Sequence, residues 1–308
     1  MIIYKYLDFD GAVKTIKGNS VLLDKPENYN DPFDCNIFST DEEEKRSCDL
    51  FVNFQMFKAF YTSLSKKTSL SPSANLFKKE LVHFGKEIKK NKRFESQTYL
   101  KPLENAFYKS IKKTKAGLKA EFKEMIKGVY EKIRDSVIVS CFGSSNDQLL
   151  MWAHYADKHR GACIEFEIDD KDFKTVHYDK KKPEFELYKT LQILFGHQLA
   201  GEEIDFDSGK YNFIYKPLLT KSPEWIYEGE IRCVYSIKKR DPKIHEALDD
   251  NGKTILLLDM PPIKRIYLGC KMNRSSEKLV KDCSGDIPII KMKKKYGEYA
   301  LEPEGYKD

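Results

Sequence analysis

The chain has 308 residues, 41% of them hydrophobic and 13% aromatic, so it can bury a sizeable core and is too apolar to stay disordered. Its apolar runs, such as residues 255–258, are far shorter than the roughly 20 residues that a membrane span needs, and the first residues predict a β-strand rather than a signal peptide. Seven cysteines without C-x-x-C spacing predict reduced structural thiols, and hence a cytoplasmic protein without membrane contact.

The net charge is +6, from 54 Lys and Arg against 48 Asp and Glu. Lysines gather in three clusters: Lys86, Lys89, Lys90 and Lys92; Lys112, Lys113, Lys115 and Lys119; and Lys291, Lys293, Lys294 and Lys295. Such clusters can contact phosphates, although a Lys-rich helix is more often a solvated face, and Arg, which reads bases better, is scarce beside Lys. Nucleic acid is therefore a candidate partner that charge alone does not establish.

The N-terminal residues predict a strand, a helix and a second strand. Residues 2–6 are rich in strand-forming side chains, and Asp8 or Asp10 can cap a short helix over residues 12–17. The next strand is expected at 21–23 because a Gly-Asn pair ends the helix before it.

Residues 41–135 predict a helical insertion. Phe51, Phe54, Phe57 and Tyr61 recur at intervals of three or four residues, which is typical of the apolar face of a helix. We expect three or four helices here, with this ring stripe in their core rather than at a ligand site.

Strands return from residue 136 onward. They are expected at 137–142, 162–168, 175–178, 230–237, 264–268 and 287–291, with helices at 187–199 and near 275–281. Early helices followed by most of the strands predict an α+β fold. We expect one catalytic domain over 1–308, with 136–300 supplying the main half of its sheet and the candidate site.

The segment around Trp152 concentrates rings and polar groups. Trp152, Tyr155 and His159 lie three and four residues apart, which predicts one helical face, and Gly161 would end that helix. Each residue taken singly is explained best by the packing of a short helix. Together with His154, they are what a nucleotide pocket needs.

The segment that ends at Arg232 predicts a loop entering a strand. Alternation on a strand would point Glu228, Glu230 and Arg232 the same way, so the two carboxylates would repel unless the guanidinium lies between them. A solvated edge strand with a salt bridge is an equally good explanation of this pattern. Gly229 favours a functional site because it lets the backbone bend and turn Glu228 into a cleft.

Several enzyme classes lack their motifs here. The sequence has no Walker loop, no G-x-G-x-x-G and no G-x-S-x-G, and its histidines have the wrong spacing for H-E-x-x-H. A metal-dependent nuclease built on Asp31, Glu228 and Glu230 remains an alternative without support from spacing.

Five sequence blocks resemble the bacterial domain-of-unknown-function family 2971. They are Tyr4-Lys5-Tyr6, Asn30-Asp31-Pro32-Phe33, Ser140-Cys141-Phe142, residues 151–155 with His159-Arg160-Gly161, and Trp225-x-Tyr227-Glu228-x-Glu230-x-Arg232. The blocks cover residues 1–40 and 136–235 in the order of that family, whereas 41–135 has no counterpart in it.

The layout of these blocks is similar to that of ADP-ribosyltransferases with a Glu-x-Glu turn. This resemblance implies a split, mostly antiparallel sheet around NAD, with Tyr4, Lys5 and Tyr6 on the first strand and Ser140 on a middle strand. It implies Glu230 as the carboxylate that stabilises the ribose cation, and Glu228 as the base for the nucleophile.

The same resemblance implies further NAD contacts. Lys5, Arg160 or Arg232 would hold the pyrophosphate, Trp152, Tyr155 or Tyr6 would stack on a ring, and His154 would bond a ribose hydroxyl. Tyr4, Asn30 and Ser140 complete the expected NAD-binding set.

These expectations converge on an NAD-dependent ADP-ribosyltransferase, a toxin or anti-phage defence effector. Its acceptor would be nucleic acid, as RNA or single-stranded DNA, or a protein, and an antitoxin is a further candidate partner. The alternatives are a metal-dependent nuclease and a non-enzymatic module that binds a nucleotide or a partner.

Overall fold

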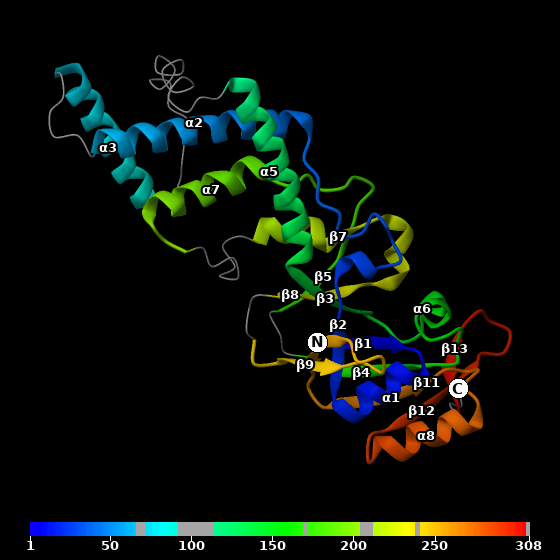
Figure 1. Cartoon of the computed structure of the whole chain (residues 1–308). Helices are drawn as coiled ribbons and strands as arrows, with labels where there is room; N and C mark the ends of the chain where they lie inside the picture. Colours follow the sequence, from blue (N-terminus) through cyan, green and yellow to red (C-terminus); the bar gives the residue numbers. More distant parts are fainter. Residues whose placement is uncertain (66–71, 92–113, 169–171, 204–211, 238–240, 306–308) are drawn as a thin grey trace. The chain divides into compact units, whose positions relative to one another are not determined.

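The computed structural model describes residues 1–65, 72–91, 114–168, 172–203, 212–237 and 241–305, which form two compact units (Figure 1). The sheet unit comprises Met1–Asn36, Ile133–Lys182 and Leu218–Asp308. The helical unit comprises Ile37–Lys132 and Pro183–Pro217. Each unit is therefore assembled from segments that are distant in the sequence.

A five-stranded sheet forms the base of the sheet unit, in the order β1-β4-β11-β12-β13. Its strands are β1 (Ile2–Leu7), β4 (Ala162–Glu167), β11 (Ile263–Leu268), β12 (Ile289–Lys294) and β13 (Leu301–Pro303). All neighbours are antiparallel except β11 and β12. Alternation along β4 separates two cores, because Ile164 and Phe166 face one and Cys163 faces the other. Helices α1 (Phe9–Gly18) and α8 (Arg274–Ser284) cover the first face, and α6 (Leu149–His154) covers the second (Figure 1).

Helix α1 has the caps that its sequence predicts. The Asp8 side chain accepts a hydrogen bond from the Gly11 N–H at 2.7 Å, and Asn19 ends the helix in the left-handed conformation with a φ of 47°. The predicted order of strand, helix and strand is confirmed.

Two three-stranded antiparallel sheets and one parallel pair complete this unit. They are β2 (Ser20–Leu23), β10 (Thr254–Asp259) and β9 (Ile244–Leu248); β3 (Val137–Phe142), β8 (Ile231–Ser236) and β5 (Phe173–Thr175); and β6 (His177–Tyr178) with β7 (Thr220–Lys221). The three short 3₁₀ helices in the described ranges are η1 (Pro26–Asn28), η3 (Asn212–Leu219) and η4 (Pro223–Glu228). An isolated bridge between Tyr4 and Gly143 joins β1 to the end of β3, so these two strands meet at one point.

The helical unit packs aromatic rings between its helices. These helices are α2 (Asp41–Ser65), α3 (Pro72–Asn91), α7 (Leu187–Ala200) and most of α5 (Lys115–Asp135). Phe51, Phe54 and Phe57 of α2 are buried, which confirms the predicted core stripe. Phe54 stacks on Phe195 of α7, with ring centroids 4.0 Å apart.

The α+β class and the mostly antiparallel sheets are confirmed, whereas the ADP-ribosyltransferase type of sheet stays a prediction. One expected strand, at 175–178, is replaced by β5 and β6, which pair with different partners. Across the described ranges, no helix is both long and apolar enough to span a bilayer.

The lysine clusters fall in different places. Lys86, Lys89 and Lys90 lie on α3, and Lys115 and Lys119 lie on α5, whereas Lys92, Lys112 and Lys113 lie outside the described residues. In the third cluster, Lys291, Lys293 and Lys295 pair with Glu277, Glu302 and Glu298. These ion pairs offset most of the positive charge of the third cluster.

Candidate active site

A cavity of about 120 Å³ lies in the sheet unit, beside the bridge that joins β1 to β3. The bridge consists of two backbone hydrogen bonds between Tyr4 and Gly143, at 2.9 and 2.7 Å. The cavity wall is a mixture of aromatic and charged side chains: Tyr4, Lys5, Tyr6, Tyr29, Asn30, Asp34, Cys141, Phe142, Gly143, Met151, Tyr155, Lys221, Glu228 and Glu230. Seven of the residues expected from the sequence therefore come together here.

A tight turn at Gly229 brings Glu228 and Glu230 to the cavity. Glu228 is the last residue of η4, Gly229 has a left-handed φ of 48°, and β8 begins directly after Glu230. The left-handed φ favours glycine here, and a Cβ at Gly229 would also lie 2.2 Å from the Ser144 Oγ, so the Ser144 side chain would have to move. The two carboxylates converge because of this turn, and the prediction that they share a strand face is wrong for Glu228.

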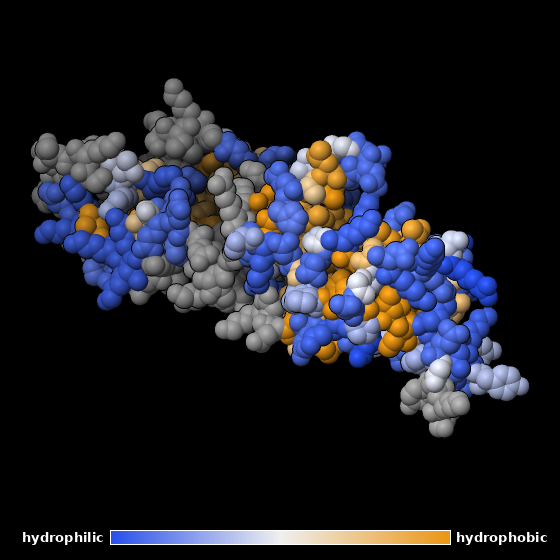
Figure 2. All heavy atoms as spheres, turned by 90° about the horizontal axis from the view of Figure 1, so that it is seen from below, coloured by the Kyte–Doolittle hydropathy of each residue, from blue (hydrophilic) through white to orange (hydrophobic). Residues whose placement is uncertain are grey.

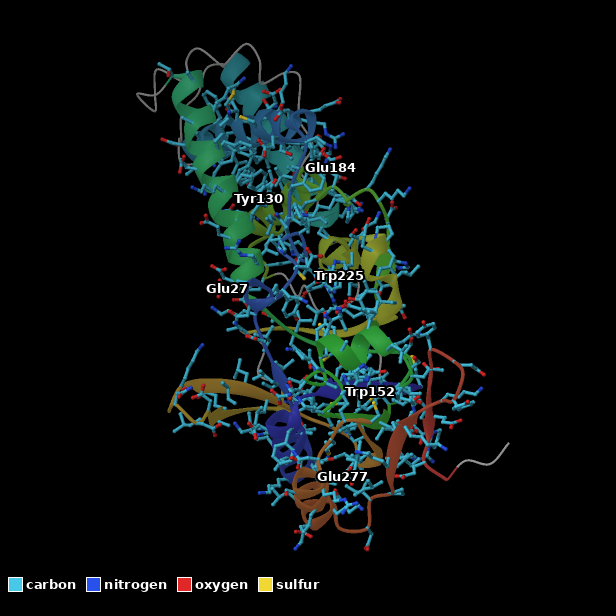
Figure 3. All side chains as sticks on the ribbon, turned by 90° about the vertical axis from the view of Figure 1, so that its right-hand side faces the viewer. Glu27, Tyr130, Trp152, Glu184, Trp225 and Glu277 are labelled. Atoms are coloured by element: carbon cyan, nitrogen blue, oxygen red, sulfur yellow. The ribbon has the colours of Figure 1, made fainter. Side chains whose placement is uncertain are left out.

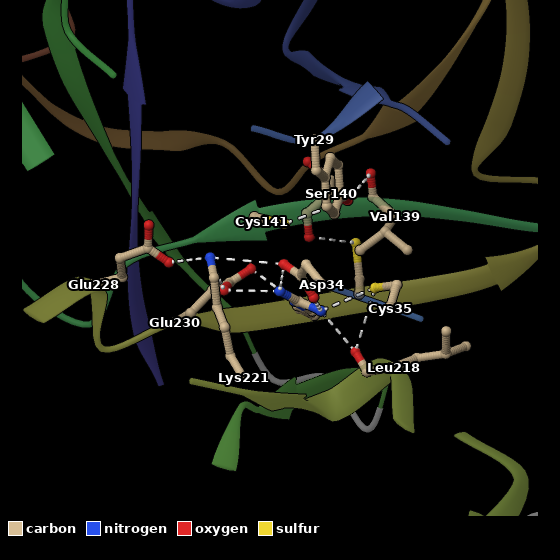
Figure 4. Close-up of polar contacts among 12 residues, drawn as sticks. Tyr29, Asp34, Cys35, Val139, Ser140, Cys141, Leu218, Lys221, Glu228 and Glu230 are labelled. Atoms are coloured by element: carbon tan, nitrogen blue, oxygen red, sulfur yellow. Dashed lines mark hydrogen bonds and ion pairs between the residues drawn. The ribbon is translucent and has the colours of Figure 1, made fainter. Parts of the chain in front are cut away.

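Arg232 is fully buried and lies between the carboxylates of Glu230 and Asp34. Figure 4 labels these two carboxylates together with Lys221 and Glu228. Arg232 binds Glu230 through two hydrogen bonds, Nε to Oε1 at 2.7 Å and Nη2 to Oε2 at 2.9 Å. It also binds Asp34 through two more, Nη1 to Oδ1 at 2.9 Å and Nη2 to Oδ2 at 2.5 Å. This double fork fixes the orientation of Glu230.

Lys221 is a second buried cation within the same cluster. Its Nζ lies 2.5 Å from Glu228 Oε2, 3.2 Å from Glu230 Oε2 and 3.6 Å from Asp34 Oδ2. The same Nζ lies 4.7 Å from the centre of the Trp225 ring. The ammonium thus bridges the two glutamates that the Gly229 turn brings together.

The two glutamates differ in protonation. Burial acts to raise the pKa of Glu230, but Arg232 and Lys221 outweigh it and lower this pKa to about 2. Burial raises the pKa of Glu228 above its ordinary value, against the opposing effects of Lys221 and Tyr155. Glu230 is therefore held as a carboxylate, whereas Glu228 is shifted toward taking up a proton.

Tyr155 connects Glu228 to the surface. Its hydroxyl donates to Glu228 Oε1 at 2.6 Å and accepts a weaker hydrogen bond from the Asn30 amide at 3.3 Å. Burial and the neighbouring carboxylate raise the pKa of Tyr155 above its ordinary range, so the phenol stays protonated. Tyr155 is positioned by its hydroxyl rather than by ring stacking.

Lys5 ties β1 to β3 on the other side of the cavity. Its Nζ donates to Ser140 Oγ at 3.0 Å and to the Cys141 carbonyl at 2.8 Å. Burial of the amine lowers the pKa of Lys5. Ser140 is buried and holds Lys5 in place without lining the cavity.

Four other expected NAD contacts also lie outside the cavity wall. Trp152 is fully buried and donates from Nε1 to the Asn146 carbonyl at 2.7 Å, so its ring is packed in the core. Arg160 is exposed and paired with Asp157 at 2.7 Å, and Arg232 is enclosed in the ion cluster. His154 is exposed at the end of α6.

The helix around Trp152 is shorter than expected. It ends at His154, and Asp157, Lys158 and His159 all have left-handed φ values, so the predicted helical face including His159 is wrong. Gly161 follows this loop, where a Cβ would lie 2.0 Å from the Leu7 carbonyl oxygen. Its role is close approach to β1 rather than helix capping.

Asp34 and Lys221 are functional candidates that the sequence analysis missed. Both are buried: Lys221 supplies a cation that the Glu228–Glu230–Arg232 set lacks, and Asp34 is the second carboxylate that holds Arg232. Two glutamates that converge with one arginine leave a net negative charge, so a second nearby cation is the signal that could have pointed to Lys221.

The carboxylates of this cluster face ammonium and guanidinium groups. In the described part of the chain, no group of three or more His, Cys, Asp and Glu side chains is arranged to hold a metal ion. Asp31, the third member of the alternative metal site, accepts a hydrogen bond from the Phe33 N–H at 2.8 Å. That bond stabilises the Asn-Asp-Pro-Phe turn.

Comparison with known proteins gives one match. Residues 151–233 match a family model described as a protein of unknown function (DUF2971). No curated protein and no solved structure matches the chain. The match supports the resemblance to family 2971 over the segment that carries Tyr155, Lys221, Glu228 and Glu230.

Proposed function

We propose that the sheet unit is an NAD-dependent ADP-ribosyltransferase. The observation that carries this proposal is the pair Glu228 and Glu230, which share one cavity wall and have pKa values shifted in opposite directions. When the environment shifts the pKa values of two carboxyl groups at one site in opposite directions, one group is suited to acid–base catalysis and the other to electrostatic catalysis.

The cavity suits one end of the dinucleotide. Tyr4, Tyr6, Tyr29 and Phe142 surround it, and rings of this kind accept a flat, positively charged ring such as a pyridinium. Pockets for drug-sized ligands enclose roughly 300–1,000 Å³, whereas this cavity encloses about 120 Å³. It therefore has room for the nicotinamide end, and the rest of NAD would lie outside it.

Glu230 is the proposed electrostatic catalyst. It stays ionised at neutral pH, and Arg232 fixes its orientation. A fixed carboxylate stabilises the positive charge that develops on the ribose as the bond to nicotinamide breaks. Each carboxylate oxygen has two lone pairs, so Glu230 can bind a ribose hydroxyl while it binds Arg232.

Glu228 is the proposed general base. It takes the proton of the acceptor nucleophile as the new bond to the ribose C1′ forms, and nicotinamide leaves as a neutral molecule. Tyr155 and Lys221 hold its two oxygens, so the carboxyl group is oriented before the substrate arrives. Of the three cations that the resemblance implies for the pyrophosphate, Lys5 is the one that lines the cavity, where Ser140 and the Cys141 carbonyl hold its ammonium.

Label transfer from labelled NAD tests this proposal. Glu230→Gln should abolish transfer to RNA, DNA and protein in a cell extract, because a neutral amide cannot stabilise the ribose cation. Glu224→Gln is the matched control, since Glu224 is an exposed residue of the same η4. Circular dichroism must find both variants folded at the assay temperature. Absence of transfer by the wild type, together with absence of NAD binding by calorimetry, would sink the proposal.

A nucleotide-binding module without catalysis is the second candidate. It is favoured by the complete pairing of Glu230, whose two oxygens both bind cations, because structural ion networks shift pKa values as catalytic sites do. This candidate predicts NAD binding by calorimetry with no transfer of label by the wild type.

A further inference from the structure

A row of aromatic rings lies on the surface beside the cavity. Trp225 and Tyr227 belong to η4, and their ring centroids are 6.0 Å apart. Tyr227 lies 6.3 Å from His154, and His154 lies 6.3 Å from Tyr155 of the cavity wall. The row therefore leads to the residue that binds Glu228.

The first three rings of this row are open to solvent. Trp225 and Tyr227 are half-buried and His154 is exposed, in contrast to the fully buried Trp152. Figure 3 labels the two Trp residues, Trp225 on η4 and Trp152 on α6. Trp225 and Tyr227 are tilted by 38° and Tyr227 and His154 by 35°, so the rings do not stack on one another. Lys221 lies over one face of Trp225, so a base would have to stack on the opposite face of that ring. Tyr and Trp are enriched at interaction surfaces, because each combines an apolar ring with a polar tip.

Apolar side chains flank the rings. Ile226 of η4 is 64% exposed and Leu150 of α6 is 48% exposed. Figure 2 shows orange hydrophobic residues among blue hydrophilic ones on one face of the molecule. The ring row thus lies at the edge of the core around Trp152, against which Tyr227 packs, and it continues into accessible apolar side chains.

A run of exposed lysines follows strand β6. Strand β6 pairs with β7, which leads into η4, and the Asp179 N–H donates to the Lys221 carbonyl at 3.1 Å. Lys180, Lys181 and Lys182 come directly after Asp179 and are exposed. This run carries three positive charges, and an acidic surface or a phosphate backbone would complement it.

We propose that this surface, formed by Trp225, Tyr227 and His154 with the lysine run 180–182, binds single-stranded nucleic acid. Unpaired bases offer their faces to the rings, and phosphates pair with the lysines. A duplex hides those faces, so it would use only the lysines. The role of the strand as the acceptor of ADP-ribose rests on the proposed function, whereas its binding does not.

Fluorescence anisotropy with a labelled single-stranded RNA 12-mer, on the full chain and without NAD, tests the binding. Tyr227→Ala and His154→Ala should each weaken it by at least about fivefold, as expected for the loss of one base stack. Tyr296→Ala and Tyr299→Ala are matched controls, because these tyrosines are 99% and 101% exposed in the turn between β12 and β13. Equal weakening by the controls, or equal affinity for a duplex of the same sequence, would overturn the proposal.

Two further readouts separate the rings from the lysines. Lys181→Glu should reduce the salt dependence of binding, because one fewer counterion is released. RNA should also shield Trp225 from iodide quenching, whereas Trp152 is already fully buried. Binding without label transfer supports this inference and contradicts only the proposed chemistry. Label transfer to protein by a chain that binds no oligonucleotide contradicts this inference and leaves the chemistry standing.

Discussion

The two units bury different kinds of side chain. The helical unit encloses rings such as Phe54, Phe57 and Phe195, whose burial stabilises the fold directly. The sheet unit encloses an ion cluster centred on Arg232 and Lys221. Removing such charges from water costs several kcal/mol per ion, and apolar side chains of similar size often serve stability equally well. The helical core is therefore explained by stability, whereas the ion cluster is not explained by stability alone.

Loss of Arg232 should give the largest effect. Arg232→Met leaves Asp34 and Glu230 buried without their main counter-charge, so the free energy of unfolding should fall by about 3–5 kcal/mol. Urea denaturation followed by circular dichroism measures this. Arg160→Met is the control, since its ion pair with Asp157 is exposed and should contribute nothing measurable. Similar losses of unfolding free energy in the two variants would mean that the buried ion pairs contribute no more to stability than an exposed one.

A ring deletion in the helical unit should be comparably large and different in kind. Phe54→Ala leaves a cavity against Phe195 and should lower the free energy of unfolding by about 3–5 kcal/mol. Because no charge is involved, the loss should be the same at pH 3 and pH 7. A loss of stability that differs between pH 3 and pH 7 would contradict the view that only the sheet unit depends on buried charges.

Acid should weaken the ion cluster through Glu230. Its folded-state pKa of about 2 lies below the ordinary 4.5, so its stabilising contribution is present above pH 4.5 and is lost as the pH falls toward 2. The shift corresponds to about 3 kcal/mol. Glu228 has the opposite sign: its pKa is raised, so its ionisation destabilises the fold at higher pH. Unfolding of wild type and Glu230→Gln between pH 2 and 7 should diverge least at the acid end, and parallel curves would contradict this account.

Local patterns in the sequence predict the elements and the identity of the glutamates well. The helix with Asp8 as its cap, the stripe of Phe51, Phe54 and Phe57, and most strands follow from spacing and capping alone. Glu228 and Glu230 could be singled out because one glycine separates them. The protonation of these glutamates depends on charged residues elsewhere in the chain. Asp34, for example, is distant from Arg232 in the sequence and contacts it only in the folded protein.

Residue rarity was a poor guide to the site. The chain has two Trp residues, and Trp152, the one expected at NAD, is fully buried, whereas Trp225 is half-buried over Lys221. Whether a Trp side chain is buried depends on which side of its helix packs against the sheet. A helix as short as α6 has too few turns for the spacing of its apolar residues to predict that side. The left-handed turn after α6 also could not be predicted from the sequence. It is formed by Asp, Lys and His, and these residues do not indicate a left-handed conformation as glycine does.

The smallest expected effect tests whether Tyr155 belongs to the ion cluster. Tyr155→Phe removes only the hydroxyl that donates to Glu228 Oε1, so the free energy of unfolding should fall by roughly 1–2 kcal/mol. That hydrogen bond lowers the pKa of Glu228, so its loss should raise this pKa further. If Glu228 acts as the base, the rise of transfer rate with pH should move to higher pH in the variant. Tyr296→Phe, at a fully exposed ring, should change neither quantity. An unshifted pH profile with reduced stability would leave Tyr155 a packing residue and separate the cluster from the chemistry.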